Sequence, residues 1–198
     1  MRTYRAVNLN VLWFLIALNV LIFVIELAVG GYPITVANPV VRLLGLARVL
    51  LAQQPWTIIT AIFVHGGPAH IIFNMISLYF LGSFFLRAVG ERSFLAVFFL
   101  GGLAGNALYL LLAPPNAIGI GASGVVFAIG GALAVLVPRV PVIVFPIPIP
   151  IPLWVAILIF FLLSFLFAGI AWQAHLGGVL AGLIAGLIIR KRRRLLYF

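Results

Sequence analysis

Only a few residues of this chain carry side chains that can do chemistry. The sequence has 198 residues, of which 7% are charged, and it contains no cysteine. It also contains no aspartate, and its two acids are Glu26 and Glu91. Thiol nucleophiles, disulfides and thiolate metal sites are thereby excluded, and so is a pair of catalytic aspartates. The candidates that remain are five serines and three histidines.

One serine stands at an unusual place. Ser123 follows a segment rich in proline and glycine, residues 114–121, which cannot continue a helix, and an apolar run comes after it. It is therefore expected in the first turn of a helix, where unpaired backbone N–H groups can stabilise an oxyanion. Gly121 and Gly124 would let another backbone approach, so a serine cap in a glycine-rich packing site is the alternative. The other serines are expected to bond helix carbonyls or to cap helices: Ser77, Ser83, Ser93 and Ser164.

A histidine further along the chain is a candidate partner for this serine. His175 interrupts an apolar run in which Gly178, Gly182 and Gly186 follow at four-residue spacing, a pattern typical of close helix contacts. A hydroxyl and an imidazole each cost several kcal/mol in hydrocarbon unless they are hydrogen-bonded. Ser123 and His175 could satisfy each other, and a serine bonded to a histidine is the minimum for acyl transfer.

Two further polar residues share one face of a predicted helix. His70 and Asn74 are four residues apart, and both can donate hydrogen bonds to a developing negative oxygen. His65 precedes Pro68 in a predicted loop, and we interpret it as structural. The three histidines share no helical face and have no carboxylate or thiolate beside them, so we predict neither a metal nor another cofactor.

The composition indicates what must position these residues. Hydrophobic residues make up 66% of the chain, in continuous runs that favour helices over barrel strands. We expect an all-α polytopic membrane protein, a single domain over residues 1–198. The predicted spans are 10–28, 69–87, 94–112, 122–137, 153–168 and 174–189. We expect the first to be a retained helix rather than a cleaved signal peptide.

Two connections between the spans are unusual. A long outer loop joins the first two, and within it residues 40–51 are predicted to lie in the membrane interface. The segment Pro146–Pro152 alternates proline with isoleucine, which excludes a helix. We expect an extended, polyproline-like segment at the membrane surface, acting as a spacer.

The basic residues predict the orientation. The net charge is +10, and basic residues cluster near the two ends, at Arg2, Arg5 and residues 190–194. With both termini cytoplasmic, every basic residue except Arg42 and Arg48 falls on the cytoplasmic side. We therefore predict a multi-pass protein of the cell membrane that contacts anionic lipid at its basic C-terminus and binds no nucleic acid.

The combined pattern resembles that of the rhomboid intramembrane serine proteases. The resemblance implies a six-helix core, a Ser123–His175 dyad, and oxyanion stabilisation by the Ser123 N–H, His70 and Asn74. It also implies an aromatic residue packed on His175, for which Phe127 is suitably placed. The residues that carry the resemblance are His70 with Asn74, Gly121-x-Ser123-Gly124, Ala174-His175-x-x-Gly178, and Trp56 in the outer loop. Two departures are Thr57 and Leu86, where many bacterial relatives have arginine and glutamate.

The function that follows is that of a serine endopeptidase cleaving transmembrane segments of other proteins through an acyl-enzyme, in an aqueous cavity open to the outer face. Because the chain has no aspartate, backbone and packing are expected to hold the tautomer of His175. The alternatives are an inactive relative that binds transmembrane clients and a small channel or transporter. Glu26 is either a functional intramembrane acid or a hydrogen-bonded support of the outer loop.

Overall fold

Helices make up most of the chain. The computed structural model describes residues 8–144, 147–167 and 169–193, and a helix lies in each of the six predicted ranges. These helices are α1 (Asn10–Gly30), α4 (Pro68–Val89), α5 (Glu91–Leu112), α6 (Ser123–Leu136), α7 (Leu153–Leu163) and α8 (Trp172–Arg193). Four of them, α1, α4, α5 and α8, are long and apolar enough to cross a membrane, whereas α6 and α7 are shorter.

Helix α7 ends five residues before the predicted boundary at residue 168, which itself lies outside the described residues. The reason is local. The backbone N–H of Ser164 bonds to the Phe161 carbonyl at 3.1 Å, and Phe165 bonds to Leu162 at 3.1 Å. These bonds span three residues instead of four, so the chain tightens and leaves the helix.

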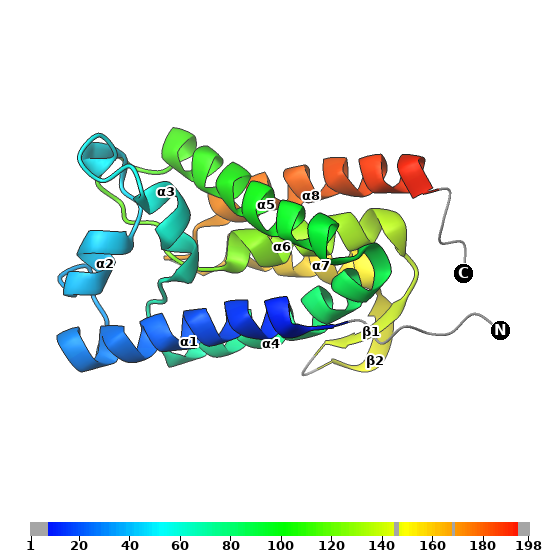
Figure 1. The fold of residues 1–198 in the computed structure, drawn as a ribbon, viewed down its shortest axis with the longest axis horizontal. Coiled ribbons are helices and arrows are strands. Elements are labelled where there is room, and N and C mark those ends of the chain that lie inside the picture. The colour runs from blue at the N-terminus through cyan, green and yellow to red at the C-terminus, as the bar shows by residue number, and fades with distance from the viewer. Residues whose placement is uncertain (1–7, 145–146, 168, 194–198) are drawn as a thin grey trace.

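The loop between α1 and α4, which we expect on the outer side, contains four short helices instead of one continuous segment over residues 40–51. They are α2 (Pro39–Leu44), η1 (Arg48–Leu50), α3 (Thr57–Thr60) and η2 (Ala61–Phe63), and Figure 1 shows α2 and α3 at one end of the molecule. The predicted segment 40–51 is interrupted because Gly45 is extended. Asn38 caps α2 by accepting from the Val40 N–H at 2.9 Å, and it donates to the Glu26 carbonyl at 2.9 Å. The loop is thereby tied to the end of α1.

The segment predicted to be polyproline-like is instead one strand of a hairpin. Strands β1 (Pro141–Val144) and β2 (Ile147–Pro152) pair antiparallel, with Val142 opposite Ile151. The segment is extended as expected, but it pairs with another strand. The isoleucines keep the N–H groups that proline lacks, and Ile151 and Ile147 pair with β1 on either side of a shift in register. Pro146 lies outside the described residues.

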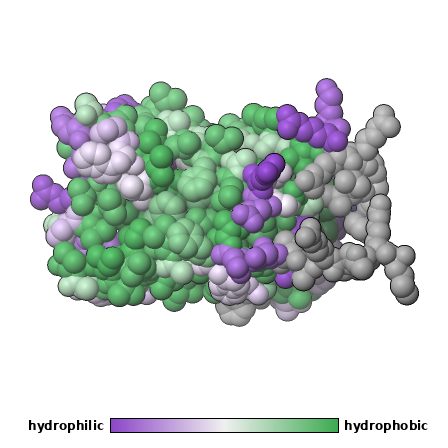
Figure 2. All heavy atoms as spheres, viewed as in Figure 1, coloured by the Kyte–Doolittle hydropathy of each residue, from purple (hydrophilic) through white to green (hydrophobic). Residues whose placement is uncertain are grey.

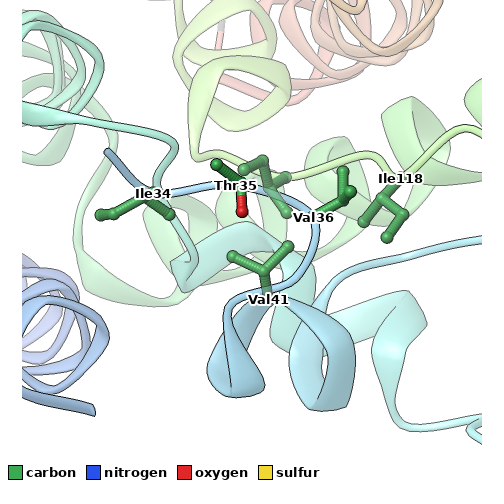
Figure 3. Close-up of a pocket in the computed structure, with 6 residues that line it drawn as sticks. Ile34, Thr35, Val36, Val41 and Ile118 are labelled. Carbon is green, nitrogen blue, oxygen red and sulfur yellow. The ribbon is translucent and has the colours of Figure 1, made fainter. Parts of the chain in front are cut away.

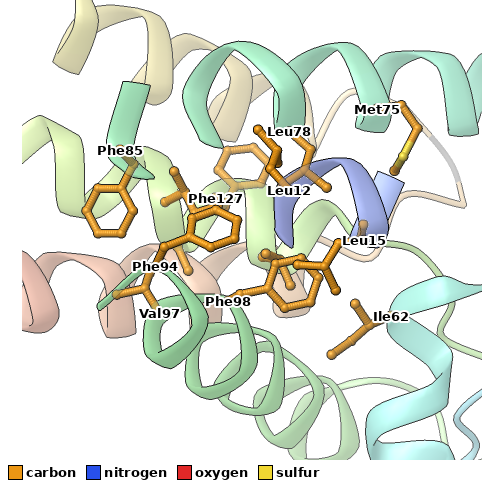
Figure 4. Packing of buried hydrophobic residues seen from close by; sticks show 14 of the residues in the cluster. Leu12, Leu15, Ile62, Met75, Leu78, Phe85, Phe94, Val97, Phe98 and Phe127 are labelled. Atoms are coloured by element: carbon orange, nitrogen blue, oxygen red, sulfur yellow. The ribbon is translucent and has the colours of Figure 1, made fainter. Parts of the chain in front are cut away.

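The helices pack around α6. Buried aromatic and aliphatic side chains from α1, α4 and α5 meet beside it, among them Leu12, Leu78, Phe85, Phe94 and Phe98 (Figure 4). On another side, α8 lies directly against α6, because a Cβ atom added at Gly178 or Gly182 would overlap a backbone carbonyl of α6. Figure 2 shows an apolar band between two more polar ends of the molecule.

Of the basic residues used to predict the orientation, Arg2, Arg5 and Arg194 lie outside the described residues. Arg42 and Arg48 belong to the end of the molecule that carries α2 and α3. The turn between α4 and α5 and the hairpin lie at the opposite end (Figure 1).

Candidate active site

Three helices begin, and one ends, where the candidate residues lie. Helices α4, α6 and α8 start at the end of the bundle that carries α2 and α3, and α7 ends there (Figure 1). Ser123 is the first residue of α6, after Gly121 with a φ of 118°. The entering segment is fixed by backbone bonds from Gly121 to Ala61 at 2.8 Å and from Gly119 to Leu46 at 2.8 Å. The partly exposed hydroxyl of Ser123 therefore has a defined place.

Ser123 and His175 are in direct contact. The Nε2 atom of His175 lies 2.7 Å from Oγ of Ser123. The close approach of α6 and α8 at Gly178 makes this distance possible, since a side chain there would meet the Gly124 carbonyl. Phe127, one turn after the serine, stacks on the imidazole with ring centroids 4.3 Å apart and an interplanar angle of 29°.

A residue that the sequence did not single out completes this cluster. Oγ of Ser164 lies 2.7 Å from Nδ1 of His175. The expected bond of Ser164 to its own helix is also present, to the Phe160 carbonyl at 3.2 Å. No spacing rule links Ser164 to His175, because an irregular turn between α7 and α8 separates them. The only signal available was a hydroxyl inside an otherwise apolar run.

The tautomer of His70 follows from its hydrogen bond. The Gly66 N–H points at Nδ1 of His70, 3.2 Å away, so Nδ1 accepts and the neutral ring carries its proton on Nε2. That edge of the ring lies against Gly121, where an added Cβ would be 2.7 Å from both Cε1 and Nε2. Asn74 is buried and donates to the His70 carbonyl at 2.9 Å, which leaves its second N–H available.

His65 lies in the loop before α4 and contacts the ring of His70. Its backbone N–H donates to the Glu26 carboxylate at 3.1 Å, and its ring meets that of His70 edge-on at 5.0 Å. Burial, together with the neighbouring His70, lowers the pKa of His65 to about 3, so the ring is neutral at physiological pH. Glu26 thus holds the loop that precedes α4. In the described ranges no three histidine or acidic side chains are grouped as a metal site would require.

An apolar cavity borders the segment that leads to Ser123. Its volume is about 350 Å³, and Thr35 is the one polar residue in its lining. The other lining residues are Ile34, Val36, Val41, Ile118 and Ile120 (Figure 3). Ile120 lies three residues before Ser123 and also reaches towards Gly66 in the loop before α4. The cavity is therefore next to both segments that position the site.

Trp56 anchors the loop between α1 and α4. Its indole N–H donates to the Leu43 carbonyl at 2.9 Å, which joins α3 to α2.

The family described as Rhomboid domain matches residues 52–192, more than half of the chain. The chain belongs to the rhomboid family. The resemblance seen in the sequence is thereby confirmed, and the rhomboid match contains Ser123, His175, His70 and Asn74.

Relatives of this rhomboid chain include proteins of Bacillus subtilis and Arabidopsis thaliana. The protein YdcA of Bacillus subtilis (strain 168) is 29% identical over 145 residues, 70% of each chain. The rhomboid protease GluP of the same organism is 33% identical over 120 residues, 60% of this chain and 23% of GluP. RHOMBOID-like protein 12, mitochondrial, of Arabidopsis thaliana is 34% identical over 158 residues, 69% of this chain and 47% of that protein. The chain thus spans less than half of the last two.

Membership in the rhomboid family and the apolar helices together indicate a multi-pass membrane protein, and homologues named as proteases point to intramembrane proteolysis. The geometry of the cluster is suited to acyl transfer. A hydroxyl is bonded to an imidazole in the first turn of α6, and the His70 ring lies against Gly121, two residues before the serine.

Proposed function

We propose that this chain is an intramembrane serine endopeptidase that cleaves transmembrane segments of other membrane proteins. The observation that carries the proposal is the 2.7 Å contact between Ser123 Oγ and His175 Nε2 at the start of α6. A hydroxyl beside an imidazole that accepts its proton is the arrangement of an activated nucleophile. Helices α4, α6 and α8 begin at the same end of the molecule, and their first turns, where the helix dipole is positive, carry His70, Ser123 and His175.

In the proposed mechanism, Ser123 Oγ attacks the peptide carbonyl carbon while His175 Nε2 takes the hydroxyl proton. The carbonyl oxygen becomes negative and accepts hydrogen bonds from the Ser123 N–H, His70 Nε2–H and Asn74. His175 then gives its proton to the departing amine as the C–N bond breaks, which leaves an acyl-enzyme. A water molecule, deprotonated by the same imidazole, hydrolyses the ester and restores Ser123.

The proposed placement in the membrane explains how water reaches the serine. We take all six helices to cross as one domain over residues 1–198, with cytoplasmic termini and the site open to the outer face. Helix α6 has 14 residues and is about 21 Å long, against a hydrocarbon thickness of about 30 Å. If its inner end reaches the inner boundary, Ser123 is recessed by about 10 Å from the outer one. A cleft of that depth admits water from the outer face, while a substrate helix approaches Ser123 from the lipid.

The apolar cavity lined by Ile34, Val36 and Ile120 is placed to receive a substrate side chain. A chain bound across Ser123 would run along residues 118–121, because this segment leads directly into the nucleophile. The apolar lining favours an aliphatic or aromatic side chain over a charged one. We therefore expect substrates to carry an apolar residue close to the cut site.

The proposal is tested by incubating the purified protein with a panel of single-span substrates and identifying the products by mass spectrometry. A fluorophosphonate probe should label Ser123, and both labelling and cleavage should disappear in Ser123→Ala and His175→Ala. Ser83→Ala is the matched control, since Ser83 is a helical serine whose hydroxyl bonds the Phe80 carbonyl. Client binding without labelling or cleavage by the unaltered protein would refute the peptidase and favour a non-catalytic role.

A further inference from the structure

The imidazole of His175 is held at both ring nitrogens. Nε2 lies 2.7 Å from the hydroxyl oxygen of Ser123, and Nδ1 lies 2.7 Å from that of Ser164. Ser164 is only 4% exposed and His175 only 6% exposed. Hydrogen bonds shielded from water in this way are electrostatically stronger than the same bonds at a surface.

The Phe160 carbonyl gives this chain of hydrogen bonds a direction. Its oxygen, 3.2 Å from Ser164 Oγ, can only accept. A serine hydroxyl has one proton, so when Ser164 donates to Phe160 it must accept from His175 Nδ1–H. The neutral imidazole then has a bare Nε2, to which Ser123 donates its proton. This is the tautomer that a general base requires.

The end of α7 explains why the hydroxyl of Ser164 is available. The Ser164 backbone N–H donates to the Phe161 carbonyl and not to the Phe160 carbonyl. The Ser164 hydroxyl donates to the Phe160 carbonyl instead, in place of the amide donor that this carbonyl would have inside a helix. The C-terminal end of a helix also carries partial negative charge, which favours a cation nearby. His175 needs this, because it lies in the first turn of α8, where the helix dipole disfavours positive charge.

We propose that Ser164 is a positioning residue that, through its bond to the Phe160 carbonyl, fixes His175 with its proton on Nδ1. The inference rests on the proposed function, in which His175 is the general base. In a chain without aspartate, the hydroxyl and the end of α7 take the place of the carboxylate that orients the histidine in a triad. Ser164 itself does not touch the substrate.

A merely structural role for Ser164 predicts something different. Ser83 also bonds a carbonyl of its own helix, that of Phe80 at 3.2 Å, but in α4 and away from His175. If Ser164 only completes the last turn of α7, then Ser164→Ala and Ser83→Ala should have similar small effects. The two variants therefore form a matched pair.

The kinetic test compares Ser164→Ala, Ser164→Thr and Ser83→Ala in cleavage of one substrate. Loss of a bond to a group that becomes charged should lower kcat by about 10- to 100-fold, with KM little changed. Ser164→Thr keeps a hydroxyl and should restore most of kcat, and Ser83→Ala should match the unaltered protein. A Ser164→Ala protein that turns over at the unaltered rate would overturn the inference.

The tautomer is read directly by ¹⁵N NMR of the full chain labelled at histidine, because protonated and bare ring nitrogens resonate in separate ranges. The chain has three histidines, and the signals absent from His175→Ala identify those of His175. The unaltered protein should show a protonated Nδ1 and a bare Nε2. Ser164→Ala should populate the other tautomer, whereas Ser83→Ala should not.

The two readouts separate failure of this inference from failure of the proposed function. If the chain neither cleaves nor takes up the fluorophosphonate, but the tautomer depends on Ser164 as stated, the peptidase is wrong and the positioning role stands. If the chain cleaves and the tautomer is the same with and without the Ser164 hydroxyl, the positioning role is wrong and the peptidase stands. A proton found on Nε2 in the unaltered protein overturns the inference without any Ser164 variant.

Discussion

The contact between Gly121 and His70 leads to a prediction that two matched variants can test. Gly121 and Gly90 both have positive φ, 118° and 83°, so an alanine at either position strains the backbone by about 1–3 kcal/mol. Among the described residues, nothing lies within 4 Å of a Cβ built on Gly90. A Cβ on Gly121 would lie 2.7 Å from His70 Cε1 and Nε2, where ordinary contacts begin at 3.4 Å. The ring must therefore move by the difference, 3.4 − 2.7 = 0.7 Å, or more.

That displacement is large for a hydrogen-bond donor to an oxyanion. A misplacement of about 1 Å can cost on the order of 10²-fold in rate, and removal of one oxyanion donor costs about 10²- to 10³-fold. We therefore expect Gly121→Ala to lower kcat/KM by about 30- to 100-fold, mostly in kcat. Gly90→Ala should cleave at nearly the unaltered rate while losing comparable thermal stability, about 2–10 °C in Tm.

The assay is cleavage of a single-span substrate by both variants in the same detergent or bilayer, with thermal unfolding measured in parallel. The stability measurement shows that the two glycines carry similar backbone strain, so that any difference in rate comes from His70. The reasoning is refuted if Gly121→Ala cleaves as fast as the unaltered protein. It is equally refuted if Gly90→Ala loses as much activity as Gly121→Ala.

Two further predictions concern the cavity and His65. Val36→Trp should fill the cavity from its rim, because Val36 lines the cavity and is also exposed. The variant should raise KM for substrates with a large apolar residue near the cut site and leave kcat unchanged for substrates with a small one. An equal loss of activity for all substrates would contradict this use of the cavity. Because the pKa of His65 falls from 6.5 to about 3 on folding, the unfolded chain binds a proton that the folded chain does not, so stability should decline as the pH falls below 6.5 towards 3. The decline should be shallower in His65→Gln by about 1.4 kcal/mol per pH unit, measured by unfolding at a series of pH values, and identical slopes would show that His65 is not held neutral.

The parts of the site that sequence could predict are those governed by local geometry. The proline and glycine residues before Ser123 require a helix to start there, and the spacing of His70 and Asn74 places both on one face. The glycines after His175 indicate a close helix contact, and in the structure that contact is with α6. Each inference needed only the helix period or the lack of a side chain.

The parts that sequence could not predict depend on contacts between distant segments. Ser164 meets His175 only because α7 ends at Leu163 and an irregular turn returns the chain to α8, and no residue pattern fixes that path. The pairing of β2 with β1 was missed because alternate prolines suggested a segment without partners. The break at Gly45 follows from the way the outer loop folds back onto the segment before Ser123. Local propensity is too weak to decide any of these.

The alternation in β2 has a consequence for how the hairpin meets its surroundings. Pro148, Pro150 and Pro152 have no N–H, and Ile151 and Ile147 lie opposite Val142 and Val144, with a shift in register between the two pairs. An unpaired N–H in contact with hydrocarbon costs several kcal/mol, and an unpaired edge with donors recruits further strands. Strand β2 therefore keeps few N–H groups that could be left unpaired or donate to an added strand. The repeated prolines thus leave β2 poor in hydrogen-bond donors, so the hairpin, in which Ile143 and Ile149 are exposed, can contact lipid with little tendency to pair with a further strand.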